Sequence, residues 1–261
     1  MAGDDGPLLE VRDLRVRFGG LQAVDGATFS VGRGSMTALI GPNGAGKTTV
    51  FNLLTGFIRA DSGAVRFAGH DIFRERPDRI ARLGLVRTFQ LTKVLSKMTV
   101  LDNVMLAAPD QPGERLDRAV FRRSWRSRED EVRAEALELL EEVGIATHAG
   151  AYAATLSGGQ KKLLELARAL MTRPRLVLLD EPMAGVNPTL GRRLLDYLGR
   201  LRAERGLTIL FVEHDMETVM GSSDDVIVMA EGAVISRGTP DHVRTDPRVI
   251  DAYLGAEPTH A

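Results

Sequence analysis

Cysteine is absent from the 261-residue chain, and the longest apolar runs are short ones such as Leu176–Leu179 and Leu207–Val212. The lack of cysteine excludes disulfides, cysteine-ligated metal sites and thiol nucleophiles. A membrane-crossing helix needs about 20 apolar residues, so we expect this chain not to cross a membrane. The acidic N-terminal segment has neither the basic nor the apolar part of a signal peptide, which predicts a cytoplasmic location.

An excess of charge of either sign is also lacking. Lysine and arginine number 34 against 35 for aspartate and glutamate, which leaves a net charge of −1. A chain without net positive charge has no overall electrostatic attraction for nucleic acid, so we expect no nucleic-acid partner. Hydrophobic residues make up 44% and charged residues 26%, which is typical of a soluble protein with one large domain or two small ones.

The pattern of apolar residues changes twice along the chain. Strand-like alternation before Gly41 gives way to helical spacing after residue 91, and strands and helices alternate again after Ser157, which predicts an α/β fold. The expected strands lie within 8–40 and at 64–67, 176–179, 207–212, 226–229 and 233–236, and the expected helices at 48–54, 100–108, 129–143, 161–171 and from 187. The predicted parts are a core at 8–90 and 156–255, a helical subdomain at 91–155 and a tail at 256–261, with 1–255 forming a single domain.

Residues 109–130 are polar and dense in arginine, with acidic residues among the arginines. The charges largely cancel locally, so we interpret this segment as a solvated insertion rather than a lipid-facing patch.

A glycine-rich loop stands between the strand that ends at Ile40 and the following helix, and it fits the pattern G-x-x-x-x-G-K-[ST]. Its backbone N–H groups and the helix dipole can hold phosphates, Lys47 can reach the β- and γ-phosphates, and the Thr48 hydroxyl can ligate Mg²⁺. The residues expected to bind ATP here are Gly41, Pro42, Asn43, Gly44, Ala45, Gly46, Lys47, Thr48 and Thr49.

Two carboxylates, Asp180 and Glu181, end the apolar run 176–179. Successive side chains of a strand point to opposite sides, so we expect Asp180 to hold Mg²⁺ and Glu181 to activate a water as general base. An isolated Asp-Glu pair at a strand end is usually solvated surface, and the accompanying phosphate loop favours the catalytic interpretation. His214 follows the apolar strand 207–212. If that strand joins the same sheet, His214 lies at the same edge and can contact the γ-phosphate, although an isolated histidine is usually structural.

A second anion site is predicted at Leu156, Ser157, Gly158, Gly159 and Gln160. Ser157 fits a helix N-cap and Gln160 the third helical position, which makes a capping box. The two glycines beside the cap leave backbone N–H groups open to an anion. One chain with two such half-sites suggests that two chains, placed head to tail, share two nucleotides.

With these motifs in place, residues 8–255 resemble the ATP-binding subunits of ABC transporters. The resemblance implies a P-loop NTPase core with an antiparallel β subdomain and an inserted α-helical subdomain. Residues 156–160 match the signature motif, which binds ATP of the partner subunit, and Asp180-Glu181 matches the Walker B end with its catalytic glutamate. Gln90 matches the Q-loop glutamine, a Mg²⁺ and nucleotide contact, and His214 matches the switch histidine. Phe18 matches the aromatic residue that stacks on adenine, with Val24 beside it.

Finer similarity is to the branched-chain amino acid uptake branch, through strings such as Phe18–Val24, Thr48–Gly56, Val86–Gln90 and Val249–Gly255. This resemblance implies a second ABC ATPase subunit, transmembrane permease subunits and an extracytoplasmic solute-binding protein as partners, and a place on the inner face of the cell membrane. Uptake of another small solute, such as urea or an amide, stays open as an alternative, as does an ABC exporter for lipid or drug. A small GTPase is excluded, since no lysine follows an asparagine as its guanine motif requires.

Overall fold

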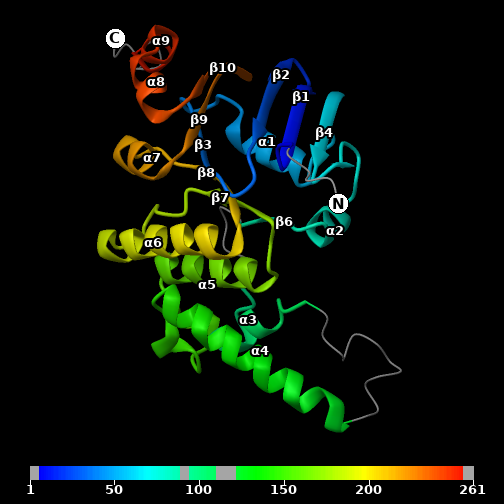
Figure 1. The fold of residues 1–261 in the computed structure, drawn as a ribbon, viewed down its shortest axis with the longest axis vertical. Helices are drawn as coiled ribbons and strands as arrows, with labels where there is room; N and C mark the ends of the chain where they lie inside the picture. The colour runs from blue at the N-terminus through cyan, green and yellow to red at the C-terminus, as the bar shows by residue number, and fades with distance from the viewer. Residues whose placement is uncertain (1–5, 89–93, 110–121, 255–261) are drawn as a thin grey trace. The chain divides into compact units, whose positions relative to one another are not determined.

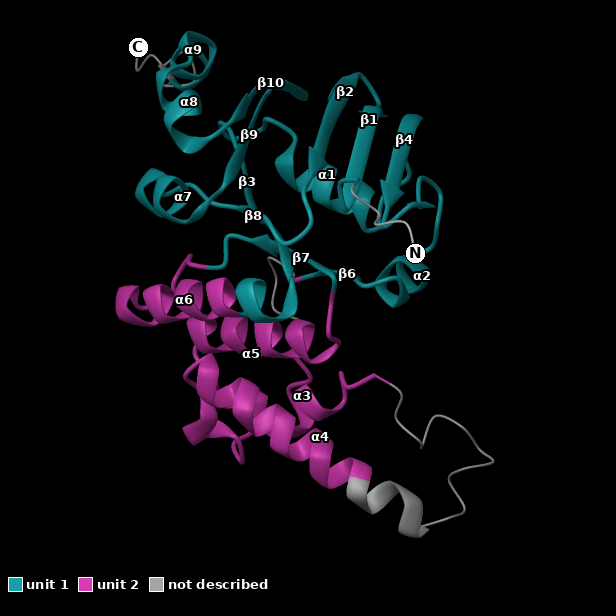
Figure 2. Cartoon of the chain, in the orientation of Figure 1, with its two compact units in different colours: residues 1–87, 175–182, 201–261 teal, residues 88–174, 183–200 magenta. Residues whose placement is uncertain are grey.

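The structure is a computed structural model that describes residues 6–88, 94–109 and 122–254. The chain forms two compact units, one of residues 1–87, 175–182 and 201–261, the other of residues 88–174 and 183–200 (Figure 2). In the described parts of the chain, no helix is long and apolar enough to cross a membrane.

The first unit holds two sheets (Figure 1). The four-stranded sheet has the order β2-β1-β4-β5, and β1 pairs antiparallel with both of its neighbours. Its strands are β1 (Leu9–Phe18), β2 (Leu21–Val31), β4 (Ser62–Phe67) and β5 (His70–Asp71).

The six-stranded sheet has the order β10-β9-β3-β8-β7-β6. Its strands are β3 (Met36–Ile40), β6 (Leu85–Arg87), β7 (Leu176–Asp180), β8 (Thr208–Val212), β9 (Asp225–Ala230) and β10 (Ala233–Gly238). Every residue of β3, β7 and β8 is buried, as expected for central parallel strands covered on both faces. Strands β9 and β10 pair antiparallel as a hairpin, and both were expected from the sequence, at 226–229 and 233–236.

Five helices of the first unit are described: α1 (Lys47–Leu54), α2 (Pro77–Arg82), α7 (Met216–Ser222), α8 (Pro240–Thr245) and α9 (Pro247–Leu254). One buried apolar cluster joins Val50 and Phe51 of α1 to Leu14 and Phe67 of the four-stranded sheet and to Leu178 of the six-stranded sheet. This shared core fixes α1, and with it the loop that precedes it, against both sheets.

The second unit is helical. It contains α3 (Val100–Met105), α4 (Arg122–Glu142), the short 3₁₀ helices η2 (Ala146–His148) and η3 (Ala153–Thr155), α5 (Gly158–Met171) and most of α6 (Pro188–Arg205). Helices α3, α4 and α5 contact one another. The expected boundary at residue 155 falls inside this unit, because α5 packs with α3 and α4; the subdomain boundaries stay a prediction.

The α/β prediction, with an antiparallel sheet and a helical insertion, is confirmed. Sequence patterns did not find the three-residue strand β6, the two-residue strand β5, or the helices α2, α7, α8 and α9. The two strands have two and three residues and the four helices have six to eight, lengths at which a periodic pattern is hard to recognise.

Candidate active site

The glycine loop between β3 and α1 is held by close backbone contacts. Gly41 has a φ of +146°, and a Cβ there would lie 2.0 Å from the carbonyl oxygen of Met229. Gly46, the N-cap of α1, has a φ of +99°, and a Cβ there would lie 2.6 Å from the carbonyl oxygen of Ala23. Side chains are therefore excluded at both positions, by strand β9 at one and by β2 at the other.

Lys47 begins α1 and folds back over this loop. Its Nζ donates to the carbonyl oxygens of Gly41 and Pro42, at 2.7 and 2.9 Å. Burial lowers the pKa of Lys47, because the charged ammonium loses hydration, while the carboxylates of Glu181 and Asp180 oppose part of that shift. The two acids predicted from the sequence thus lie close enough to act on the Lys47 ammonium.

Three adjacent strands bring the predicted catalytic residues to one edge of the sheet. Strand β8 pairs in parallel with β3 on one side and with β7 on the other. The carboxyl ends of these strands lead to Gly41, to Asp180 and Glu181, and to His214. The prediction that His214 follows a strand of the same sheet is therefore confirmed.

Asp180 is paired with Arg87, an arginine outside the residues predicted to form the site. Arg87 Nη2 lies 2.7 Å from Asp180 Oδ2, and the exposed fractions of the two side chains are 4% and 1%. Arg87 Nη1 donates to Asn52 Oδ1 at 2.6 Å. The only available signal was an arginine in a short apolar segment just before the Gln90 motif, and that signal does not identify a partner.

The second oxygen of Asp180 gives a test of the predicted magnesium site. Asp180 Oδ1 is buried and has no hydrogen-bond partner among the described residues, a costly arrangement that a cation would relieve. A carboxylate together with the Thr48 hydroxyl is an oxygen donor set that suits Mg²⁺, which usually takes one or two protein ligands plus substrate phosphates. The residues present therefore fit the ion. In the same described ranges, no group of three His, Cys, Asp or Glu residues forms a metal site without phosphate.

Glu181 leaves the strand in an unexpected conformation. Its φ is +49°, so Glu181 is not part of the extended strand. The argument that strand alternation points its side chain away from that of Asp180 therefore does not apply. Its backbone N donates to the carbonyl of Val212 at 3.0 Å, which holds the turn. A non-glycine residue in this region costs about 1–3 kcal/mol, and such strain is common at active sites.

His214 and Glu181 contact each other directly. The distance from His214 Nε2 to Glu181 Oε1 is 2.8 Å, and the side chains are 49% and 24% exposed. The general base and the switch histidine expected from the sequence therefore form a hydrogen-bonded pair. The contact of His214 with a γ-phosphate stays a prediction.

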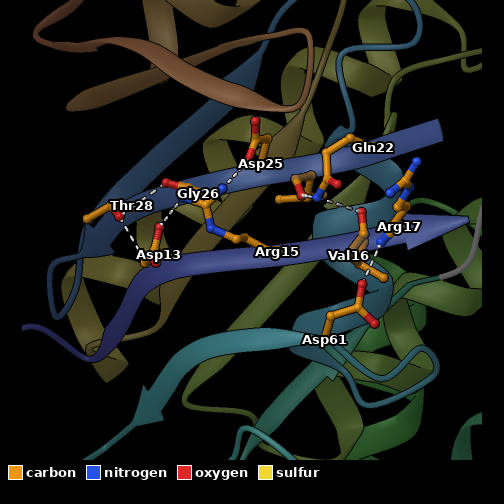
Figure 3. Close-up of polar contacts among 10 residues, drawn as sticks. Asp13, Arg15, Val16, Arg17, Gln22, Asp25, Gly26, Thr28 and Asp61 are labelled. Carbon is orange, nitrogen blue, oxygen red and sulfur yellow. Dashed lines mark hydrogen bonds and ion pairs between the residues drawn. The ribbon is translucent and has the colours of Figure 1, made fainter. Parts of the chain in front are cut away.

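The predicted adenine platform lies at the end of a β-hairpin. Phe18 ends β1, pairs with Leu21 of β2, and is 46% exposed. Val24 is fully buried, so its side chain would have to be uncovered before it could touch a nucleotide. Two hydrogen bonds stabilise this hairpin (Figure 3). The amide of Gln22, in the hairpin itself, donates to the carbonyl of Val24 at 2.9 Å. The carboxylate of Asp61, which is not part of the hairpin, accepts from the backbone N of Arg17 at 2.8 Å.

Farther along the same two strands, a second set of polar contacts lies where the pairing of β1 with β2 shifts register, between Val11 and Arg15. The Arg15 guanidinium bridges Asp13 of its own strand and Asp25 of β2, and Thr28 accepts from the backbone N of Asp13 (Figure 3). These exposed contacts stabilise the hairpin rather than add to the site.

The predicted second anion site lies in the helical unit, at the start of α5. Ser157 caps the helix by accepting from Gln160 N at 3.3 Å, and Gln160 Oε1 accepts from Ser157 N at 2.9 Å, so the capping box is confirmed. Gly158 is exposed, whereas Leu156 is buried. A Cβ on Gly159 would lie 2.6 Å from the carbonyl oxygen of Gly185, so this glycine permits a close backbone approach between the cap and the loop before α6.

Gln90, predicted to contact Mg²⁺ and nucleotide, lies outside the described residues, as does the segment 110–121 of the arginine-rich region.

Comparison with known proteins identifies the family. A family model described as "ABC transporter" matches residues 24–184, and one described as "Branched-chain amino acid ATP-binding cassette transporter" matches residues 233–259. The high-affinity branched-chain amino acid transport ATP-binding protein BraF of Pseudomonas aeruginosa is 43% identical over 250 residues, which cover 95% of this chain and 98% of BraF. The chain belongs to the ABC transporter ATP-binding family.

Other ABC proteins extend the likeness over nearly the full length. The probable branched-chain amino acid transport ATP-binding protein LivG of Archaeoglobus fulgidus is 43% identical over 250 residues, which cover 96% of each chain. The solved ADP conformation of the ABC transporter cassette MJ1267 has 36% identity and a TM-score of 0.79, and the match covers 96% of this chain and 99% of that one. The resemblance to ABC cassettes predicted from the sequence is thereby confirmed.

Proposed function

We propose that the chain is the ATP-hydrolysing subunit of an ABC importer that takes up branched-chain amino acids. The relatives named for branched-chain amino acid transport support the solute, and they match along almost the whole chain. The observation that carries the chemistry is the Glu181–His214 pair at the sheet edge that also carries the phosphate loop.

In this proposal the phosphates of ATP lie in the loop of residues 41–49, where backbone N–H groups and the Lys47 ammonium bind them. Binding requires Lys47 Nζ to exchange the carbonyls of Gly41 and Pro42 for phosphate oxygens. Phe18, half exposed at the hairpin end, stacks on the adenine ring.

Glu181 is the general base that accepts a proton from the attacking water. His214 orients the Glu181 carboxylate through their hydrogen bond and contacts the γ-phosphate when ATP is bound. Thr48, Asp180 and Gln90 would hold Mg²⁺. The ion would neutralise charge on the β- and γ-phosphate oxygens.

The site is completed by a second subunit, either another copy or a sibling ABC ATPase. Its signature residues 156–160 would bind the γ-phosphate from the opposite side, through the open N-terminus of α5 and the Ser157 hydroxyl. Closure of the two subunits on two ATP molecules would then move the transmembrane permease subunits. The chain would lie on the inner face of the cell membrane, in a system with an extracytoplasmic solute-binding protein.

Uptake of radiolabelled leucine tests this function in a strain that lacks the gene and any redundant system. The wild-type gene should restore uptake of leucine, isoleucine and valine, whereas Glu181→Gln should not, although the protein is present at the same level. If leucine uptake is the same with and without the gene, the solute assignment is wrong. Parallel assays with urea and acetamide identify the alternative importers, and drug or lipid efflux identifies an exporter.

A further inference from the structure

Arg87 connects the two elements that carry the proposed metal ligands. Thr48 lies on α1, and Asp180 ends β7. The Arg87 guanidinium donates through Nη1 to Asn52 of α1 and through Nη2 to Asp180, at 2.6 and 2.7 Å. One planar group therefore spans the gap between the helix and the strand.

The Arg87 backbone and guanidinium are themselves held in place by further contacts. Arg87 ends β6, which pairs in parallel with β7, so its backbone is fixed beside the strand that carries Asp180. The guanidinium carbon lies 5.5 Å from the centre of the Phe51 ring on α1, a cation–π contact that limits its movement. Both Arg87 and Asp180 are almost fully buried, so water does not screen the pair.

The pair uses only one oxygen of the carboxylate. Oδ2 accepts from Arg87, whereas Oδ1 is buried without a hydrogen-bond partner among the described residues. The guanidinium therefore fixes which oxygen is left for a cation and in which direction it points. A lysine at position 87 would keep the charge but could not reach Asn52 and Asp180 with the same planar fork.

From this geometry we propose that Arg87 is a positioning residue for metal binding, a brace that sets Asp180 Oδ1 against the Thr48 side of the phosphate loop. The inference rests on the proposed role of Asp180 as a metal ligand. The brace has an opposing effect, because a positive charge beside the carboxylate repels a cation. We infer that the fixed orientation outweighs the repulsion, because a freed carboxylate could turn towards the Lys47 ammonium.

When Arg87 is replaced, loss of the fixed Asp180 orientation would weaken metal binding, whereas loss of the positive charge would strengthen it. Electron paramagnetic resonance with Mn²⁺ measures metal affinity for the full chain with bound adenylyl-imidodiphosphate, independently of hydrolysis. Arg87→Met should weaken Mn²⁺ binding about tenfold, and Arg87→Lys about threefold. Tighter or unchanged binding in Arg87→Met, or wild-type binding in Arg87→Lys, would overturn the proposal, since charge alone would then explain the pair.

Asn52→Ala provides a milder variant in case Arg87→Met does not fold. It leaves the Arg87–Asp180 pair and the Phe51 contact intact and removes only the hydrogen bond from Arg87 to Asn52 of α1, so binding should weaken two- to threefold. Unchanged affinity in a folded Asn52→Ala protein would overturn the brace. The control is Arg237→Met, which removes an ion pair with Asp225 at the β9–β10 hairpin and should leave Mn²⁺ affinity unchanged.

Asp180→Asn separates this inference from the proposed function on which it rests. If Asp180→Asn binds Mn²⁺ as tightly as wild type, the role of Asp180 as a ligand fails, and the brace fails with it. If Asp180→Asn weakens binding while the Arg87 variants do not, only the brace fails.

Discussion

His214 Nε2 lies 2.8 Å from Glu181 Oε1, and each residue follows the carboxyl end of one of two neighbouring parallel strands. The contact is possible because Glu181 turns out of β7 with a φ of +49°. The histidine can therefore act on the reaction in two ways. In the proposed mechanism it orients the Glu181 carboxylate through this hydrogen bond, and on ATP binding it turns to the γ-phosphate.

Replacement of His214 tests this relationship. His214→Ala leaves Glu181 without its orienting partner, so the turnover number should fall about 100-fold, within the usual range for a group that assists proton transfer. Nucleotide affinity should stay within threefold of wild type, because Lys47 and the loop amides remain. Phosphate release by the assembled transporter and a nucleotide titration measure the two quantities. His70→Ala, at the exposed strand β5, is the control; turnover of His214→Ala within threefold of this control would remove His214 from the mechanism.

The phosphate loop depends on the absence of a side chain at Gly41. In Gly41→Ala, the new Cβ would lie 2.0 Å from the carbonyl oxygen of Met229, so either the loop or β9 must move. Nucleotide affinity should fall at least tenfold. Gly69→Ala is the matched control, because Gly69 also has a positive φ, +81°, but its Cβ would meet no atom within 4 Å.

The control variant should lose only about 1–2 kcal/mol of stability, the cost of a left-handed L-residue, and keep full nucleotide binding. Isothermal titration with ADP compares the two proteins. Equal ADP affinities would show that the loop accepts a side chain at Gly41 and that the close approach does not shape the site.

The C-terminal segment contains a carboxylate that titrates abnormally. Hydrogen bonds from Arg248 and Ser236 hold the pKa of Asp246 well below its usual range. The folded protein therefore binds fewer protons than the unfolded chain at low pH, so the stabilisation is complete above about pH 4 and decreases as the pH falls further.

Thermal unfolding between pH 7 and pH 2 tests this stabilisation. Asp246→Asn should lower Tm at pH 7, and the difference from wild type should shrink as the pH drops below 4. Asp241→Asn is the control, because the ion pair of this exposed carboxylate with Arg244 is long, at 3.7 Å, and open to water. A Tm difference for Asp246→Asn that stays constant down to pH 2 would contradict the assigned cause.

Local signals explain what could be predicted from the sequence. The phosphate loop, the capping box at Ser157 and the buried strands β3, β7 and β8 each depend on residues close together in the chain, and each is found in the structure. The position of His214 at the same sheet edge as Lys47 and Asp180 was predicted from a general rule, because the carboxyl ends of parallel strands in one sheet collect the residues of a site.

Contacts between distant segments explain what could not be predicted. Arg87 and Asp180 are 93 residues apart, and only the pairing of β6 with β7 shows that they meet. The backbone conformation of Glu181 was missed for a related reason, since its turn is held by the carbonyl of Val212 on the adjacent strand. The burial of Val24 is likewise a result of tertiary packing.

Glu181→Gln tests whether Glu181 is the general base at a site that a second subunit completes. The amide keeps the shape of the side chain but cannot accept the proton, so ATP hydrolysis should fall at least 100-fold. With ATP and Mg²⁺ the variant should form a stable dimer with two bound nucleotides, measured by light scattering after size exclusion, whereas Glu181→Gln with Ser157→Ala should dimerise more weakly. A Glu181→Gln protein that hydrolyses ATP at near the wild-type rate would show that Glu181 is not the base, and one that stays monomeric with ATP would show that no second subunit completes the site.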